Sequence, residues 1–342
     1  MSRRTLTLLL ASLLALGLAL AGAVQRVPYV ALSPGPAINT LGGSGADEVL
    51  KITGAPTYPA DGSLSLTTVS VRDHLTLFEA ITGWLSPREA VIPREIVFPP
   101  DKTDKEQQAE NVQQMQQSQS DATTAALHEL GIPAVTTVAI TSVAKGSPAD
   151  GKLKPGDVLT TIDGTKVVDA ASVRTLIRAR TPGATVTIGY TRDGKPGTVT
   201  LATVRSSDAP VRPVVGITPD ENSVFPIKVD IRLQDIGGPS AGLMFALGII
   251  EKLGKDSLTG GKKIAGTGEI TSDGKVGEIG GIAEKMIGAK DRGATVFLSP
   301  AKNCPEAKDT KPDGMLLIKV DTLRGALAAL KTLREGGTPP SC

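Results

Sequence analysis

The sequence predicts a multidomain α+β protein that begins with a transmembrane helix. Two arginines and a long uncharged run open the chain, and two later segments mix strand-like and helix-like periodicity. At 342 residues the chain is long enough for two or three domains, each with its own core. We expect a signal-anchor helix over 1–26, an extended and helical region over 27–130, a β-rich domain with two helices over 131–205, a linker over 206–213, an α+β domain over 214–335 and a tail over 336–342.

The overall charge argues against a nucleic-acid partner. Lys and Arg number 37 and Asp and Glu 35, which leaves a net charge of +2. Such a balance creates no global field for a polyanion. The chain has only five Phe, three Tyr and one Trp, and no dense basic patch is interleaved with them. We therefore expect no nucleic acid among its partners.

The N-terminal run is the predicted membrane anchor. Arg3 and Arg4 precede nineteen uncharged residues, 6–24, close to the roughly 20 that a spanning helix needs. Because basic residues stay on the cytoplasmic side, we expect a single-pass protein of the cell membrane with Gln25 and all later residues outside the cytoplasm. The alternative is a cleaved signal peptide, since Ala21-Gly22-Ala23 resembles a cleavage site. A retained anchor is favoured because the run is longer than a typical signal core.

Residues 27–130 predict an alternating strand and two helices. From Ser63 the alternation of Leu64 and Leu66 with polar residues is typical of a strand. Asp73 is the expected cap of a helix that ends near residues 83–84. Residues 105–120 contain seven glutamines, which is compatible with a disordered linker. Apolar residues nevertheless recur over 112–130 at spacings near three and four, so we predict a helix that leads to Gly131.

Residues 131–205 carry a series of turns and strands with a recognisable order. A strand over 137–143 precedes Ser147-Pro148-Ala149, then 153–159 (LKPGDVL) and 162–164 (IDG), a helix over 170–179 and strands over 185–192 and 198–204. This series resembles bacterial PDZ domains, which bind an extended chain end as an added strand. The expected carboxylate loop, residues 132–137, lacks the alternating Gly-hydrophobic pattern of peptide-binding members. The resemblance leaves open whether the groove captures peptides or is a packing surface.

The stretch 237–285 contains the candidate chemistry. Ser240 lies between a Gly-Gly-Pro turn and an apolar run that starts at Leu243, where a helix is expected to begin. Lys285 follows 45 positions later, at the end of a Gly-Gly-hydrophobic-X-Glu-Lys segment. Together with the Thr-Gly-Glu-Ile segment that starts at Thr267, these pieces resemble the proteolytic domain of the Lon family. The alternative for Ser240 alone is a serine that merely caps a helix.

The resemblance implies a Ser-Lys dyad. Ser240 is the expected nucleophile and Lys285 its base, which must be neutral through burial. Thr267 matches a family threonine that contacts the lysine, and backbone N–H groups around Gly238, Pro239 and Ser240 are the expected oxyanion hole. One position departs from the pattern: many family members have an acidic residue three before the serine, and this chain has Gly237.

Membrane anchor, PDZ domain and Lon-type domain, in this order, resemble the membrane-anchored PDZ-containing Lon-like proteases of bacteria. No stretch fits the phosphate loop G-x-x-x-x-G-K-[ST], so we expect no nucleotide. We also expect no other cofactor and no metal. The expected function is ATP-independent serine endopeptidase activity on unfolded protein or peptide substrates outside the cytoplasm, with a homo-oligomer as a further possibility. The alternative is a non-catalytic envelope adaptor whose PDZ domain binds partners while a degenerate Lon-type domain is only a scaffold.

Cys304 and Cys342 are the only cysteines, and an outward domain favours their oxidation. Cys304 is expected in a loop, and Cys342 is the last residue, so a disulfide between them needs no passage through the core. The alternative is a pair of free thiols. A bridge would close a loop of about 40 residues and stabilise the fold by about 4 kcal/mol in the chain-entropy model.

Overall fold

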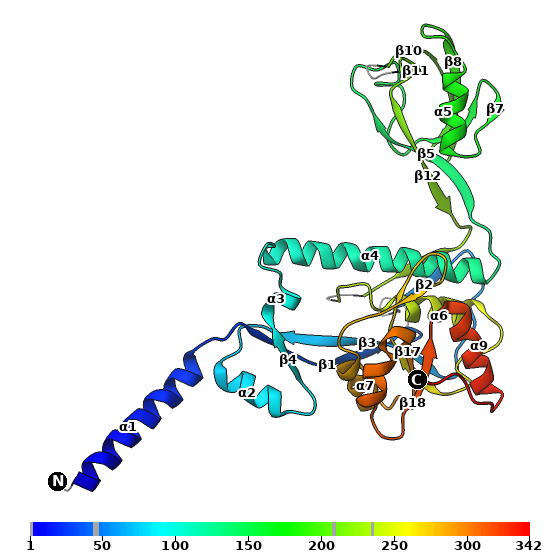
Figure 1. The fold of residues 1–342 in the computed structure, drawn as a ribbon. Helices are drawn as coiled ribbons and strands as arrows, with labels where there is room; N and C mark the ends of the chain where they lie inside the picture. The colour runs from blue at the N-terminus through cyan, green and yellow to red at the C-terminus, as the bar shows by residue number, and fades with distance from the viewer. Residues whose placement is uncertain (1–2, 44–47, 207–209, 234–235) are drawn as a thin grey trace. The chain divides into compact units, whose positions relative to one another are not determined.

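A computed structural model describes residues 3–43, 48–206, 210–233 and 236–342 (Figure 1). The chain forms two compact units, one comprising residues 1–131 with 227–342 and the other residues 132–226. Residues 1–2 of the expected anchor and residues 207–209 of the expected linker lie outside the described residues.

The first unit is built on a six-stranded sheet whose strands come from both ends of the chain. Its order is β18 (Leu316–Val320), β17 (Val296–Pro300), β14 (Lys263–Gly266), β3 (Ser63–Arg72), β1 (Tyr29–Asn39) and β4 (Ala90–Pro93). The pairs between β18 and β3 are parallel, and β1 is antiparallel to both β3 and β4. The expected division between 27–130 and 214–335 is therefore replaced by one domain, because β14 pairs directly with β3.

Two helices cover opposite faces of this sheet. A Cβ at Gly266 would lie 2.8 Å from Met244 of α6 (Gly242–Leu253), whereas Ala265 packs with Ile282 and Met286 of α7 (Ile282–Asp291). Neighbouring strand residues point to opposite faces, so α6 and α7 lie on opposite sides of β14. All eleven residues from Gly242 to Lys252 of this twelve-residue helix are buried.

The predicted glutamine-rich helix is present as α4 (Asp104–Glu129). Thr103 and Glu106 form a capping box at its start. Its buried positions recur at helical spacing, and the helix contacts α6 and α9 (Leu323–Arg334). These buried residues are Met115, Ser118, Ala122, Ala125, Ala126 and Leu127. The helix is mostly polar, and it packs against the rest of the unit through one face of apolar and small residues.

The N-terminal part of this unit contains α1 (Arg3–Val24), α2 (Leu77–Leu85) and α3 (Arg94–Val97), while β2 (Leu50–Thr53) pairs with β13 (Lys228–Ile231). The predicted cap of α2 is wrong. Thr76 caps the helix, and its partner in the capping box is Glu79. Asp73 instead accepts hydrogen bonds from the Arg94 guanidinium at 3.0 and 3.1 Å, which ties the turn before α2 to α3.

The second unit is a six-stranded sheet covered by helix α5 (Ala170–Arg178). Its order is β12 (Ile217–Val224), β5 (Val135–Val143), β6 (Val158–Ile162), β8 (Thr185–Arg192) and β9 (Lys195–Ala202), with β7 (Thr165–Lys166) beside β6. A separate pair joins β10 (Val204–Arg205) and β11 (Pro213–Val214). The expected boundary at residue 214 is wrong, because β12 pairs with β5 along its length and so belongs to this unit.

Candidate functional site

Ser240 lies in the turn that leads into α6. The helix begins at Gly242 with Ala241 as its N-cap, so Ser240 stands two residues before the first helical residue. Gly238 has a φ of +83°, a value that residues with a side chain rarely adopt. The Gly-Gly-Pro sequence therefore allows the sharp turn that presents Ser240 at the positive end of the α6 dipole.

Lys285 lies in the first turn of α7, on the other side of β14. Its N–H donates to the carbonyl of Gly281 at 3.1 Å, and Gly281 is the left-handed N-cap of the helix. Lys285 is only 3% exposed. Among the described residues, no carboxylate forms an ion pair with it.

Thr267 connects the serine turn with the lysine. This residue follows β14 and is fully buried. Its hydroxyl donates to the carbonyl of Ser240 at 3.0 Å and accepts a hydrogen bond from the Lys285 amine at 3.3 Å. The N–H of Gly268 donates to the same Ser240 carbonyl at 2.8 Å. The structure thus brings together three residues that lie far apart in the sequence.

Burial lowers the pKa of Lys285 to about 8, although the carboxylates of Glu269 and Glu284 oppose the shift. Desolvation disfavours the charged ammonium, and no salt bridge compensates for it. Desolvation also raises the pKa values of Glu269 and Glu284, and attraction to Lys285 only partly offsets this effect. A neutral amine is consequently accessible near neutral pH at this position.

Helix α4 holds the serine turn from outside. The Ser118 hydroxyl donates to the carbonyl of Pro239 at 2.9 Å, and the N–H of Gly238 donates to the carbonyl of Asn111 at 3.0 Å. A Cβ at Gly237 would lie 2.9 Å from the Cβ of Asn111, so α4 leaves no room for a side chain there. Gly237, which stands where many family members have an acidic residue, therefore lies where α4 packs against the turn. Nothing in the sequence pattern links these residues, which are more than a hundred positions apart.

The open N–H groups of the turn differ from those expected. Gly238 uses its N–H on Asn111, and Pro239 has none. Among the described residues, the N–H groups of Ser240 and Ala241 have no hydrogen-bond partner. These two donors, at the start of α6, are the ones free to bind an oxyanion.

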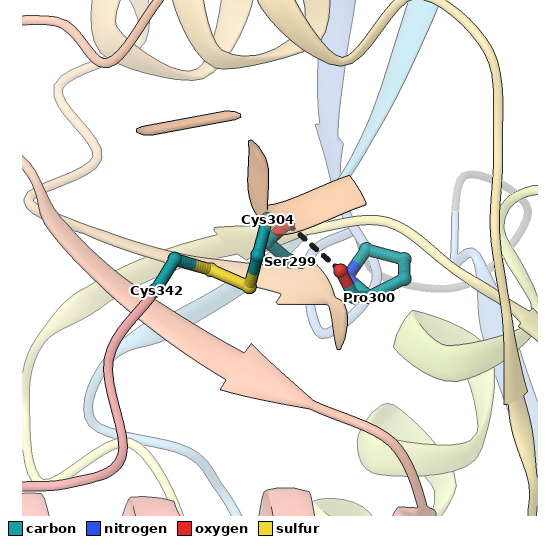
Figure 2. The surroundings of a disulfide bond; sticks show 4 residues. All are labelled: Ser299, Pro300, Cys304 and Cys342. Atoms are coloured by element: carbon teal, nitrogen blue, oxygen red, sulfur yellow. Dashed lines mark hydrogen bonds between the residues drawn. A yellow bond between two sulfur atoms is a disulfide. The ribbon is translucent and has the colours of Figure 1, made fainter. Parts of the chain in front are cut away.

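The Cys304–Cys342 disulfide is present in the structure and closes 38 positions of chain (Figure 2). Cys304 begins the short helix α8 (Cys304–Asp309), so its expected place in a loop is wrong. The preceding residue, Asn303, donates to the carbonyl of Ile279 at 2.8 Å and accepts from its N–H at 3.0 Å. The bridged segment therefore holds the loop that leads into α7 and Lys285.

The second unit has a groove of about 540 Å³ between α5 and the segment of chain around β11 and β12. Val173 and Ile177 of α5, both buried, form part of its apolar wall. All charged residues that line it are arginines: Arg174, Arg178, Arg205 and Arg212. The groove thus combines apolar surface with positive charge.

One end of this groove has open backbone donors. The N–H groups of Val215 and Gly216 have no hydrogen-bond partner within the described part of the chain. Gly216 has a φ of +81°, and a Cβ there would lie 2.1 Å from Ser147. The carboxylate loop expected at residues 132–137 is thus replaced by the turn between β11 and β12, which precedes the edge strand of the sheet.

Two family models match parts of this chain. Residues 110–203 match the family model of the PDZ domain, and residues 231–329 match that of the Lon protease (S16) C-terminal proteolytic domain. A Lon protease of Lachnoclostridium phytofermentans is 39% identical over 92 residues, which cover 25% of this chain and 11% of that protein. A Lon protease of Mesomycoplasma hyopneumoniae is 38% identical over 105 residues, covering 30% and 12%. The chain thus spans only about a tenth of the length of these relatives.

One solved structure is similar to part of this chain. The PDZ domain of an SdrC-like protein from Listeria innocua is 29% identical, and the match covers 24% of this chain and 92% of that one, with a TM-score of 0.23.

Proposed function

This chain carries a PDZ domain and a Lon-type proteolytic domain, and we propose that it is a serine endopeptidase with Ser240 and Lys285 as its catalytic dyad. The observation that supports the proposal best is the bonded series of Ser240, Thr267 and Lys285. A serine at a helix start and a buried lysine without an ion-pair partner are the two groups that this chemistry requires.

The mechanism begins with a neutral Lys285. Its amine takes the proton of the Ser240 hydroxyl while Oγ attacks the carbonyl carbon of the scissile peptide bond. The N–H groups of Ser240 and Ala241 stabilise the oxyanion of the tetrahedral intermediate. Lys285 then gives its proton to the leaving amine, the C–N bond breaks, and an acyl-enzyme remains. A water molecule, deprotonated by the same amine, hydrolyses the ester and releases the second product.

Thr267 acts on the orientation of both groups. Its hydroxyl has one proton, which it donates to the Ser240 carbonyl, so it can only accept a hydrogen bond from Lys285. This arrangement aims an N–H of the lysine at Thr267 and leaves the nitrogen lone pair for another direction. We infer that Thr267 is a positioning residue for the base.

We place the reaction at the outer face of a cell membrane. One helix of the described residues, Arg3–Val24, is long and apolar enough to span a bilayer. Arg3 and Arg4 favour a cytoplasmic N-terminus. Since the sequence has no phosphate-loop pattern, we propose that substrates are unfolded or flexible segments that are cut without ATP.

The PDZ groove is the proposed recruitment site. A polypeptide end can add to the free edge of β12 with its carboxylate on the N–H groups of Val215 and Gly216. Arg174, Arg178 and Arg205 have no ion-pair partner among the described residues, which favours chains with acidic residues near that end. This recruitment mode is tested with the Ser240→Ala chain. Its affinity for peptides that end in a free carboxylate is compared with its affinity for peptides that end in an amide.

A serine-reactive fluorophosphonate probe tests the catalytic proposal. The full chain in detergent should be acylated at Ser240, as read from the mass of the modified peptide, and should degrade unfolded casein. Ser240→Ala and Lys285→Ala should each abolish cleavage, with no further loss in the double variant, since the two residues act as a unit. Ser120→Ala is the matched control for a serine outside the site. If the probe does not label Ser240 although the chain still binds peptides, the result would favour the non-catalytic adaptor instead.

A further inference from the structure

Helix α2 has its large apolar residues on the outside. The exposed fractions are 41% for Leu77, 45% for Phe78, 39% for Ile81, 55% for Trp84 and 80% for Leu85. Positions 77, 78, 81, 84 and 85 fall on one face of a helix. The opposite face carries Ala80 and Gly83, both buried. Small residues thus face the protein and large apolar residues face away from it.

The inward face of α2 is closely packed. Ala80 lies in an apolar cluster with Ala31 and Leu75. A Cβ at Gly83 would lie 2.6 Å from the side chain of Val91. A helix that packs through small residues cannot rotate its large residues inward without a clash.

The helix has little charge to oppose an apolar environment. Glu79 is its one charged residue. Its carboxylate accepts hydrogen bonds from the N–H and the hydroxyl of Thr76, at 2.7 and 2.9 Å, within the capping box. These hydrogen bonds lower the pKa of Glu79 and turn its charge toward the start of the helix. The exposed face of α2 therefore contains no charged side chain.

The position of this face is set by the end of α1. The N–H of Leu77 donates to the carbonyl of Gln25 at 3.1 Å, and the N–H of Val27 donates to the carbonyl of Leu75 at 2.9 Å. A Cβ at Gly22 would lie 3.0 Å from the ring of Phe78. Helices α1 and α2 are thus in contact where the apolar anchor ends, as Figure 1 shows at the N-terminal end of the chain.

Trp84 of this exposed face forms an aromatic pair with Tyr29. The rings of Tyr29 and Trp84 meet edge to face, with centroids 5.4 Å apart. The indole N–H of Trp84 donates to the carbonyl of Val91 at 3.1 Å, which holds the ring in place. Tyr and Trp concentrate at the boundary between lipid and water, where their rings are both apolar and polar.

We propose that α2 lies in the outer surface of the bilayer beside the anchor, with Leu77, Phe78, Ile81, Trp84 and Leu85 in contact with lipid. The inference rests on the membrane location of the proposed function and goes beyond it. A single spanning helix would leave the first unit free to tilt, whereas a second apolar contact with lipid restrains its orientation toward the membrane. The occupant of this face is the acyl-chain and headgroup boundary, and not a second protein.

Trp84 is the only tryptophan of the chain, so its fluorescence reports this face alone. The full chain is reconstituted into phosphatidylcholine vesicles whose acyl chains carry bromine near the headgroup or near the methyl end. We expect strong quenching by the shallow bromines, weaker quenching by the deep ones and little quenching by aqueous acrylamide. Quenching by acrylamide alone would overturn the proposal, as would shielding from both quenchers, which would indicate a protein partner.

Two double variants sharpen the test. Phe78→Gln with Ile81→Gln should shift Trp84 emission to longer wavelength and exchange lipid quenching for acrylamide quenching. Val168→Gln with Val211→Gln, which replaces two residues that are each 59% exposed in the second unit, should change neither. Vesicle flotation after an alkaline wash separates the two proposals. A chain that floats with Trp84 in water retains its anchor but refutes the role of α2, and a chain that does not float refutes both.

Discussion

The Lys285 amine lies 3.3 Å from the hydroxyl of Thr267, which also donates to the carbonyl of Ser240. Lysine and serine are thereby joined through one side chain that has no surface exposure. This contact gives a buried amine an acceptor without giving it a countercharge, so the amine is oriented while its pKa stays low.

Activity should rise with pH through about 8. The pKa of Lys285 is lowered to about 8 by burial, and only the neutral amine can act as a base. Below this pH the lysine is protonated and the rate falls about tenfold per pH unit. Rates of peptide cleavage at saturating substrate give the profile. Lys290→Met, an exposed change in the same helix, should leave it in place, and a flat profile between pH 6 and 9 would contradict the assignment of the base.

Thr267→Val should reduce kcat by about 10- to 100-fold with little change in KM, because the base loses its orientation while the substrate contacts remain. The valine keeps the volume of the buried side chain. Thr40→Val is the matched control, since Thr40 is also buried and donates to a backbone carbonyl, that of Leu64, at 2.8 Å. Equal losses in the two variants would mean that Thr267 acts only through stability.

Ser118→Ala should loosen the serine turn. The carbonyl of Pro239 would lose its hydrogen bond from Ser118 and keep the longer one, 3.4 Å, from the N–H of Gly242. Loss of one such hydrogen bond costs about 0.5–1.5 kcal/mol. If that cost falls on the reactive geometry, kcat drops by up to about tenfold. Ser120→Ala, two residues further along α4 and exposed, is the control. Full activity in Ser118→Ala would show that α4 packs on the turn without helping to position Ser240.

Replacing both cysteines by serine should destabilise the first unit by up to about 4 kcal/mol, since the disulfide spans 38 positions. Because Asn303 holds the loop before α7, activity should decline at a lower temperature than overall unfolding. Thermal scans with and without reductant, run beside activity measurements, test this order. If the chain contains the disulfide and the reductant changes neither its thermal unfolding nor its activity, the disulfide has no stabilising role.

The anchor prediction concerns topology. Externally added protease should degrade the chain beyond Gln25 in cells stripped of outer layers, while a tag before Arg3 stays protected. The chain should also stay with membranes after high-salt and alkaline washing, because burial in lipid and not charge holds a spanning helix. A soluble product whose N-terminus is Val24 would instead show cleavage after Ala23.

The sequence by itself determined the elements whose signals are local. The uncharged run of 6–24 is read directly as a helix, and β3 begins at Ser63, where the alternation predicts a strand. The Gly-Gly-Pro turn before Ser240 and the segment ending in Lys285 are likewise short patterns of residue type. Each of these depends on neighbours a few positions away, which is the range over which periodicity and turn chemistry act.

Only the tertiary structure decided which distant segments meet. The pairing of β3 with β14, and of β12 with β5, joins strands that the sequence assigned to different domains. Strand pairing leaves no periodic mark on either partner, because both strands show the same alternation whichever neighbour they have. The hold of α4 on the serine turn arises in the same way. Ser118 and Pro239 are 121 positions apart, and one hydrogen bond between a hydroxyl and a carbonyl demands no residue pattern that a single sequence reveals.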